Sequence, residues 1–124
     1  MFSGIIQAQG KISKVLKSKD FLSIEVQSNL KGYKIGSSIC CSGICLTATS
    51  VSKNKFTADI SKETLKKTNA KLWKKGTLLN LENSLKIGDE ISGHFVFGHV
   101  DTTGKLLKIK KVGKSWLVSI LFPK

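Results

Sequence analysis

Three cysteines lie within residues 36–49, a stretch of small, uncharged and apolar residues that begins with Gly-Ser-Ser and ends with Leu-Thr-Ala-Thr. A disulfide framework does not suit an odd number of thiols, two of which, Cys40 and Cys41, are adjacent. A structural zinc site does not suit them either, because its ligands come in pairs separated by a loop and no histidine lies near Cys45. We therefore predict no metal site, and free thiols in a reducing compartment, which indicates the cytoplasm.

The charge of the chain could indicate a nucleic-acid partner. The formal net charge is +13 at pH 7, and all 21 basic residues are lysine. Cationic side chains supply most non-specific affinity for phosphates, but bidentate readout of bases mostly uses arginine. The lysines are scattered along the chain, and the aromatic residues do not interleave with them as a stacking platform requires. We interpret the lysines as a solvated surface and expect no nucleic-acid partner.

Length and hydropathy limit the architecture. A chain of 124 residues with 40% hydrophobic content can form one domain and a fraction of another. No window approaches the roughly 20 apolar residues of a membrane span. The first residues lack the basic region and apolar run of a signal peptide, so we expect neither a membrane partner nor export.

The elements that must position the thiols are expected to be strands. Residues 22–26, 76–82 and 116–120 are short, rich in branched and aromatic side chains, and partly alternating. Glycines separate these segments. Further strands are expected over residues 95–107 and 116–122. The pattern predicts an all-β fold built around a closed antiparallel barrel.

One short helix is predicted over residues 61–68. Ser61 is a suitable N-cap, Glu63 lies in the first turn, and lysines follow in the last turn. This order of charges matches the helix dipole.

A weak internal repeat relates the two ends of the chain. Residues 4–12 align with residues 98–106, with glycine at the first and seventh positions of both segments, and residues 22–26 fall on residues 116–120 in the same register. Such a repeat indicates a duplicated domain. We predict one complete unit over residues 1–93 and the incomplete start of a second unit over residues 94–124.

Five motifs in this order resemble a known family. They are the opening Met-Phe-Ser-Gly-Ile-Ile, Gly-Ile-Cys-Leu-Thr at residues 43–47, Asp-Ile-Ser-Lys-Glu-Thr-Leu at 59–65 followed by Thr-Asn at 68–69, Leu-Asn-Leu-Glu at 79–82, and Gly-His-Phe-Val-Phe-Gly-His-Val-Asp at 93–101. Together they are similar to riboflavin synthase of the alpha-chain, lumazine-binding type, over the whole chain. Against that family, we expect the chain to be truncated within the second repeat.

The resemblance implies a fold, a reaction and an assembly. The fold is a six-stranded antiparallel Greek-key barrel with a short helix, followed here by the first strands of a second, similar barrel. The reaction is the dismutation of two molecules of 6,7-dimethyl-8-ribityllumazine to riboflavin and 5-amino-6-ribitylaminouracil. It needs no cofactor, and the family assembles as a homotrimer in which the two lumazines face each other.

The resemblance also implies the site residues. His99, Cys45 and Ser38 are the candidate catalytic residues, because a histidine imidazole titrates near neutrality and Cys45 either adds to C7 of lumazine or hydrogen-bonds its edge. Cys40 and Cys41 are expected to pack in the interior. The candidate substrate-binding residues are Gly4, Ile5, Ile6, Cys45, Leu46, Thr47, Asp59, Ile60, Ser61, Lys62, Glu63, Thr64, Gly98, His99 and Val100.

Three functions compete at this stage. The first is riboflavin synthase. The second is a non-catalytic single-barrel protein that binds lumazine or flavin. The third, against which the lysine-only composition counts, is a basic oligonucleotide-binding barrel.

Overall fold

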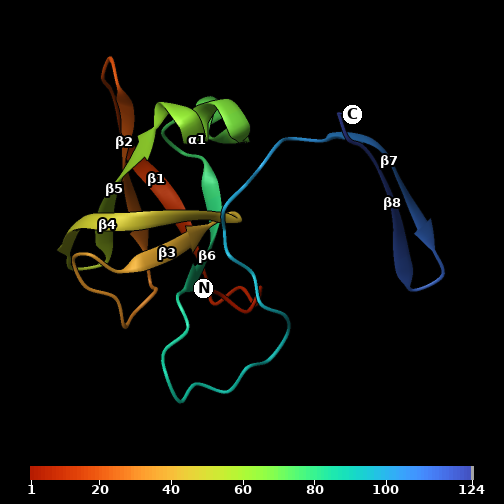
Figure 1. Ribbon diagram of the computed structural model, residues 1–124, viewed down its shortest axis with the longest axis horizontal. Coiled ribbons are helices and arrows are strands. Elements are labelled where there is room, and N and C mark those ends of the chain that lie inside the picture. Colours follow the sequence, from red (N-terminus) through yellow and green to blue (C-terminus); the bar gives the residue numbers. More distant parts are fainter. Residues whose placement is uncertain (124) are drawn as a thin grey trace.

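A computed structural model describes residues 1–123 and contains a closed, entirely antiparallel barrel with the strand order β1-β2-β5-β4-β3-β6 (Figure 1). The connections are not simply up and down, because β2 pairs with β5 and β6 lies between β1 and β3. The predicted six-stranded Greek-key barrel is confirmed. Its strands are β1 (Ala8–Lys17), β2 (Phe21–Ser28), β3 (Ser38–Cys41), β4 (Ile44–Ser52), β5 (Lys55–Ser61) and β6 (Leu78–Asn83).

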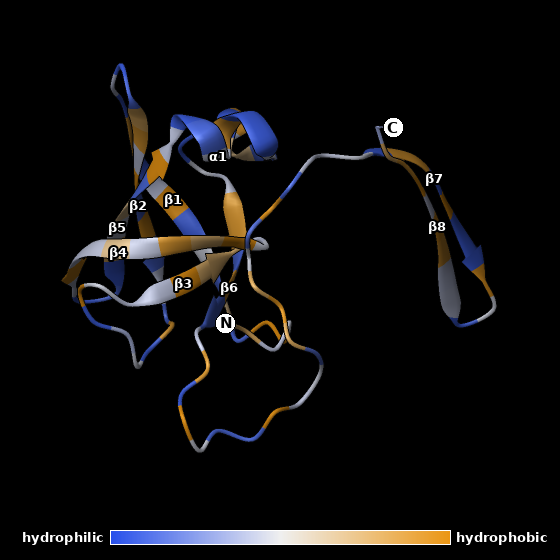
Figure 2. Cartoon of the chain, viewed as in Figure 1, coloured by the Kyte–Doolittle hydropathy of each residue, from blue (hydrophilic) through white to orange (hydrophobic). Residues whose placement is uncertain are grey.

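The barrel interior is filled by alternate side chains of its strands. In β2, Leu22, Ile24 and Val26 are buried while most of their neighbours are partly or fully exposed. This period of two follows from the pleat, which points successive side chains to opposite faces. Figure 2 shows the same alternation of hydrophobic and hydrophilic residues along the barrel strands. The core is therefore specified by simple strand patterning.

The predicted helix is also present. Helix α1 (Lys62–Lys67) follows β5 directly, and the Ser61 hydroxyl accepts a hydrogen bond from the Thr64 amide at 3.2 Å, which makes Ser61 the N-cap as expected. A 3-10 helix, η1 (Asn69–Leu72), continues from it and buries Ala70 in the core. Among residues 1–123, no helix is long and apolar enough to cross a membrane.

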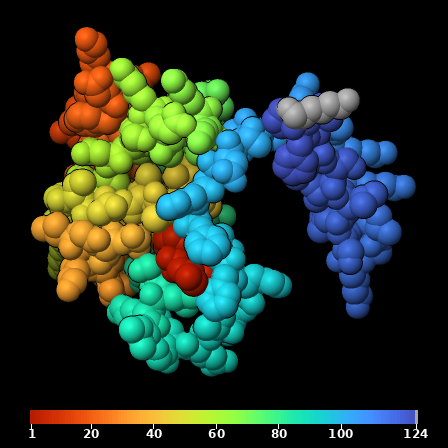
Figure 3. Space-filling model, viewed as in Figure 1, coloured from red at the N-terminus to blue at the C-terminus, as the bar shows by residue number. Residues whose placement is uncertain are grey.

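A second sheet of two strands follows the barrel. Strands β7 (Lys105–Val112) and β8 (Ser115–Leu121) form a hairpin that stands apart from the barrel and exposes nearly every residue (Figures 1 and 3).

This hairpin has the same register as the β1–β2 hairpin, displaced by 94 residues. Ile12 lies opposite Val26, and Leu106 lies opposite Ile120. A bulge follows at the same place in both, before Lys14 and before Lys108. A Cβ built on Gly10 would lie 2.7 Å from Val26, and one on Gly104 would lie 2.7 Å from Ile120. The second sheet thus starts a second barrel in the manner of the first.

One strand prediction was wrong. Residues 95–107 do not form a strand: the first regular strand after β6 begins at Lys105, and Val96 makes only an isolated bridge to Phe2. The reason is tertiary, since residues 94–100 leave the expected second unit and run back along the first barrel. The prediction of strands at 22–26, 76–82 and 116–120 agrees with β2, β6 and β8.

Candidate functional site

Strand β4 carries the central cysteine. Ile44, Leu46 and Ala48 are buried in the core, so Cys45 and Thr47 point to the opposite, outer face of the strand. Cys45 is half-buried, and its partner across the ladder is Cys40 of β3. Cys40 shares this outer face because it lies directly opposite Cys45, but it is buried, so Cys45 is the most accessible of the three thiols.

A return segment, residues 94–100, covers this outer face. The amide of Cys45 donates to the carbonyl oxygen of Gly98 at 2.9 Å. Gly98 has φ +73°, and an added Cβ would lie 2.9 Å from the Cβ of Cys45 and 3.0 Å from its amide nitrogen. Glycine is required here both by the backbone conformation and by the close approach of the two chains.

The return segment, the start of β4 and helix α1 enclose a cavity of about 260 Å³. Cys45 forms one wall, His99 and its neighbours form a second, and Glu63 and Thr64 of α1 form a third. The lining residues are Ile44, Cys45, Glu63, Thr64, Lys67, Thr68, Gly98, His99 and Val100.

The helical wall carries an ion pair. Lys67 Nζ lies 3.0 Å from Glu63 Oε1, one helical turn away. The hydrogen bond from Lys67 lowers the pKa of the Glu63 carboxyl, and the same bond raises the pKa of Lys67. Both side chains are solvent-exposed, so the pair supplies paired charges at the rim of the cavity rather than stability.

The structure brings together part of the predicted site. Cys45, Glu63, Thr64, Gly98, His99 and Val100 meet at this one cavity, although they come from three distant parts of the sequence. Gly98 to Val100, which the repeat assigns to a second unit, line a cavity of the first barrel.

Other predicted residues lie elsewhere. Ser38 pairs with Thr47 across the β3–β4 ladder, outside the lining of this cavity. Leu46 and Ile60 point into the barrel core. Asp59, Ser61 and Lys62 lie at the exposed corner between β5 and α1, next to the cavity wall rather than in it.

Three lining residues were missed by sequence reasoning. Ile44 precedes Cys45, Lys67 lies four residues after Glu63, and Thr68 ends the helix with its hydroxyl donating to the Thr64 carbonyl at 2.7 Å. The helical spacing from Glu63 and Thr64 was the available signal for Lys67 and Thr68, because positions four apart share one face.

The other two cysteines are not part of the lining of this cavity. Cys40 and Cys41 are buried, Cys41 is part of the core cluster, and all three thiols are free. Burial raises the pKa of the Cys40 and Cys41 thiols well above the ordinary value, which keeps them protonated. Packing is therefore their structural role.

The N-terminal arm, residues 1–6, runs beside the return segment and not into the cavity. Phe2 and Val96 exchange two backbone hydrogen bonds, and the His94 amide donates to the Ser3 carbonyl at 3.0 Å. In Figure 3 the arm is seen packed between the barrel and the residues that lead into the return segment. Ile5 and Ile6 remain half exposed.

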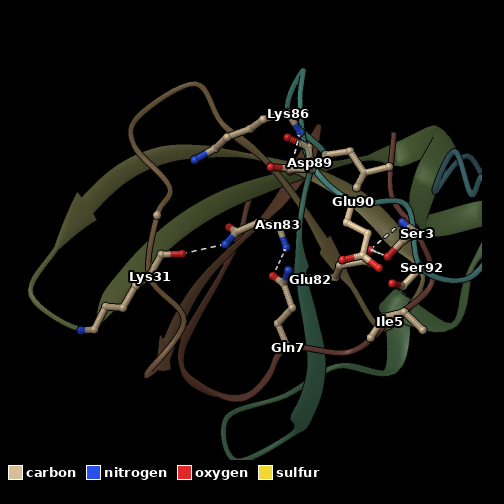
Figure 4. A pocket seen from close by; sticks show the side chains of 13 residues that line it. Ser3, Ile5, Gln7, Lys31, Glu82, Asn83, Lys86, Asp89, Glu90 and Ser92 are labelled. Atoms are coloured by element: carbon tan, nitrogen blue, oxygen red, sulfur yellow. Dashed lines mark hydrogen bonds between the residues drawn. The ribbon is translucent and has the colours of Figure 1, made fainter.

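A second, larger cavity of about 460 Å³ lies at the arm, between it and the loop that follows β6 (Figure 4). The Glu82 carboxylate lies at its inner side and accepts hydrogen bonds from Ser3. Asn83, the last residue of β6, donates from its side-chain NH₂ group to the Lys31 carbonyl after β2 and from its backbone amide to the Gln7 side chain before β1. Within residues 1–123, no cluster of three or more His, Cys, Asp or Glu side chains is arranged to hold a metal.

Comparison with known families gives one matching model. The lumazine binding domain model matches residues 3–84, which cover the whole barrel.

Several curated relatives are named riboflavin synthase. The protein from Buchnera aphidicola subsp. Baizongia pistaciae is 41% identical over 107 residues, which are 84% of this chain and 50% of the relative. The proteins from Actinobacillus pleuropneumoniae and Bacillus subtilis (strain 168) are 39% and 37% identical, over 88% and 90% of this chain and 52% and 53% of theirs. The chain thus spans about half the length of the curated relatives it matches.

Solved structures share the fold. LumP complexed with riboflavin superposes with a TM-score of 0.83 over 100% of this chain and 68% of that chain, at 23% identity. LumP complexed with 6,7-dimethyl-8-(1'-D-ribityl) lumazine gives the same TM-score over 100% of this chain and 70% of that chain.

Proposed function

Because this chain belongs to the lumazine-binding domain family, we propose that it functions in riboflavin synthase, the enzyme that converts two molecules of 6,7-dimethyl-8-ribityllumazine to riboflavin and 5-amino-6-ribitylaminouracil. The observation that carries the proposal is the cavity at Cys45. There, three of the family motifs, far apart in the sequence, meet around one space of about 260 Å³. We further propose that the reaction takes place in the cytoplasm, where thiols stay reduced.

The cavity offers the groups that a flat, polar ring requires. The missing side chain of Gly98 lets the return segment lie directly against Cys45, which brings the Gly98 backbone into the cavity lining. Thr64 and Thr68 supply hydroxyls, and Ile44 and Val100 supply apolar contacts. With Glu63, Lys67 and His99 included, most of the lining residues are polar, and polar groups at a small-molecule site fix the orientation of the ligand. We assign the lumazine ring to this cavity.

The chemistry assigns roles to two residues. The 7-methyl group of lumazine is acidic because its carbanion is delocalised into the ring, so one lumazine loses a methyl proton and attacks while the other accepts a nucleophile at its C7. His99, at the cavity wall, is our candidate for accepting that proton. Cys45 is the candidate for either addition to C7 or a hydrogen bond to the ring edge.

The repeat explains why residues Gly4, Ile5 and Ile6 stay outside this cavity. They correspond to Gly98, His99 and Val100, and Gly4 shares the left-handed backbone of Gly98 with φ +81°. We infer that the N-terminal arm lines the ligand cavity of a second barrel, as the return segment lines the cavity of the first. Ser38, beside Thr47, is then proposed to act from the strand next to Cys45. We propose that the protein assembles as a homotrimer in which two bound lumazines face each other.

Ligand titration and turnover test the proposal together. We expect saturable quenching or a shift of riboflavin and lumazine fluorescence at one site per barrel, because the ring leaves water. Riboflavin formation from lumazine, compared with a protein-free control, measures the reaction. A folded protein that gives no saturable signal with either ligand would reject the site itself.

The alternative is a non-catalytic module that binds lumazine or flavin. The observation that favours it is that the described residues contain one closed barrel, whereas the reaction needs two lumazines. Saturable binding without any riboflavin formation supports this alternative, and turnover above the control rejects it.

A further inference from the structure

We propose that Glu82 is a positioning residue that clamps the N-terminal arm, and through the arm holds the return segment against β4 so that the Cys45 cavity is complete. The inference rests on the proposed function for the identity of the ligand. The clamp itself depends only on contacts within residues 1–123.

Glu82 is a fully buried carboxylate at the end of β6, only 2% exposed. Three donors converge on it. The Ser3 amide donates to Oε1 at 2.6 Å and the Ser3 hydroxyl to the same atom at 2.9 Å (Figure 4). The Gly4 amide donates to Oε2 at 3.2 Å. Burying a carboxylate is unfavourable unless it is hydrogen-bonded. The three hydrogen bonds from the arm offset the loss of hydration of Glu82.

The arm, held by Glu82, in turn holds the return segment in place. Phe2, next to the clamped Ser3, is fully buried and exchanges backbone hydrogen bonds with Val96 at 2.8 and 3.0 Å. The Ser3 carbonyl accepts from the His94 amide. Thus two consecutive residues of the arm hold two alternate residues of the return segment.

The return segment in turn forms the cavity wall. A Cβ built on Gly98 would lie 3.2 Å from the Phe2 ring and 2.9 Å from Cys45, so Gly98 is packed between the arm and β4. Gly98, His99 and Val100 follow the bridge at Val96 directly and line the cavity. Displacement of Phe2 would therefore release the wall that carries His99.

A return segment without a strand ladder needs such a clamp. Residues 91–104 contain no regular strand or helix, and their backbone hydrogen bonds to the arm and to β4 are made with Phe2, Ser3 and Cys45. Segments with few backbone hydrogen bonds open locally at small cost. The clamp thus determines how well the cavity is preorganised for its ligand.

The residue type is specific. A carboxylate accepts hydrogen bonds at both oxygens, whereas a glutamine amide of the same size has one acceptor oxygen and one donor NH₂ group. In Glu82→Gln, the NH₂ group would therefore meet either the two Ser3 donors or the Gly4 amide. At least one buried donor then loses its partner.

The first experiment measures amide hydrogen exchange in the free protein. In Glu82→Gln we expect exchange at His94, Val96 and Cys45 to be at least roughly tenfold faster, because local opening exposes these donors. Exchange in the β2–β5 ladder should not change. The matched control is Glu25→Gln on the β1–β2 hairpin. It also replaces a carboxylate that accepts from a serine hydroxyl, that of Ser13, and it additionally removes the ion pair with Lys55, but none of its contacts involves the arm.

The second experiment measures riboflavin affinity by fluorescence titration of the same variants. We expect the dissociation constant to rise about tenfold in Glu82→Gln, at unchanged barrel exchange, and to stay at the wild-type value in Glu25→Gln. Local exchange unchanged at His94 and Val96 would overturn the clamp. Faster exchange with unchanged affinity would overturn its link to the cavity.

A milder pair of variants keeps the proposal testable if Glu82→Gln does not fold. Ser3→Ala removes one of the three bonds to Glu82, and Ser13→Ala removes the equivalent hydroxyl bond to Glu25. Only Ser3→Ala should accelerate exchange at Val96. If the wild-type chain binds no riboflavin, the ligand proposal fails, and the exchange data still decide the clamp.

Discussion

Cys40, Cys41 and Cys45 lie within six residues of one another and have different roles because of the strand pleat. Cys41 points into the core, whereas Cys40 and Cys45 share the opposite face, with Cys40 buried and Cys45 half-buried at the cavity. Alternation along a strand places neighbours in different environments. At the residue scale, the three thiols therefore separate into packing and site positions.

Serine substitution should distinguish these positions. In Cys41→Ser, a hydroxyl replaces a thiol in the core, which should lower the free energy of unfolding by about 1–2 kcal/mol without changing ligand affinity. In Cys45→Ser, the stability should change little, while riboflavin affinity or turnover falls. Chemical denaturation and fluorescence titration check the two effects. Equal effects on stability and on affinity at both positions would contradict the assignment.

The pH dependence of stability offers a second test. Burial raises the pKa of Cys41 in the folded state, so this thiol contributes stability that is fully present below the unfolded value near 8.5 and is lost as pH rises toward the folded pKa. Above about pH 9, we expect the free energy of unfolding to fall by up to roughly 1.4 kcal/mol per pH unit from this group. Urea unfolding of Cys41→Ala should show a flatter alkaline profile than wild type. If the free energy of unfolding falls with pH equally steeply in wild type and Cys41→Ala, Cys41 is not the cause of the alkaline loss of stability.

At the element scale, the site depends on a segment with almost no regular structure. The return segment is fixed by Phe2, by Ser3 and by the bond from the Cys45 amide to Gly98. Helix α1 contributes the opposite wall and is itself fixed by its Ser61 cap. The cavity therefore forms only when β4, helix α1 and the return segment are all held in place.

Substitution of Gly98 should displace the return segment from β4. In Gly98→Ala, the new Cβ would meet the Cβ and the amide nitrogen of Cys45 at 2.9 and 3.0 Å, in addition to the backbone strain at φ +73°. We expect riboflavin affinity to fall at least about tenfold because the wall is displaced.

The control is Gly113→Ala in the β7–β8 turn. Gly113 also has a positive φ, +60°, but no atom lies within 4 Å of an added Cβ. This variant therefore reports backbone strain without a clash, and its ligand affinity should equal that of wild type. An affinity loss of the same size in both variants would show that the approach to Cys45 is not the cause.

At the scale of the whole molecule, the chain consists of a closed barrel, a return segment that completes the barrel's cavity, and a hairpin apart from both (Figure 1). The hairpin exposes apolar side chains such as Leu107, Trp116 and Phe122. Exposed strand edges with apolar faces tend to pair with other chains. The division into residues 1–93 and 94–124 stays a prediction, and the return segment packs with the first part.

Two shortened chains test where the functional unit ends. Residues 1–103 keep the return segment and lack the hairpin, so we expect them to bind riboflavin with the affinity of the whole chain and to associate less at high concentration. Residues 1–92 lack Val96 and Gly98, which leaves Phe2 without its partner strand and the cavity without one wall. Their affinity should fall at least about tenfold. Titration and analytical ultracentrifugation measure both effects, and equal affinity of the two shortened chains would show that the return segment plays no part.

The sequence by itself determined the barrel, the helix and the chemistry of the motifs, because strand alternation, the Ser61 cap and the repeat register are local signals that appear in one stretch of chain at a time. It also led to Cys45 and His99 as site residues, whose roles stay predictions. Only the tertiary structure decided that residues 94–100 leave their expected strand, that they line a cavity of the first barrel, and that buried Glu82 holds the arm beside them. These facts rest on contacts between residues about 50 to 80 positions apart, such as Cys45 with Gly98 and Ser3 with Glu82. The hydrophobic pattern of a single segment does not encode such contacts, because they depend on how the folded barrel, the arm and the return segment pack against one another.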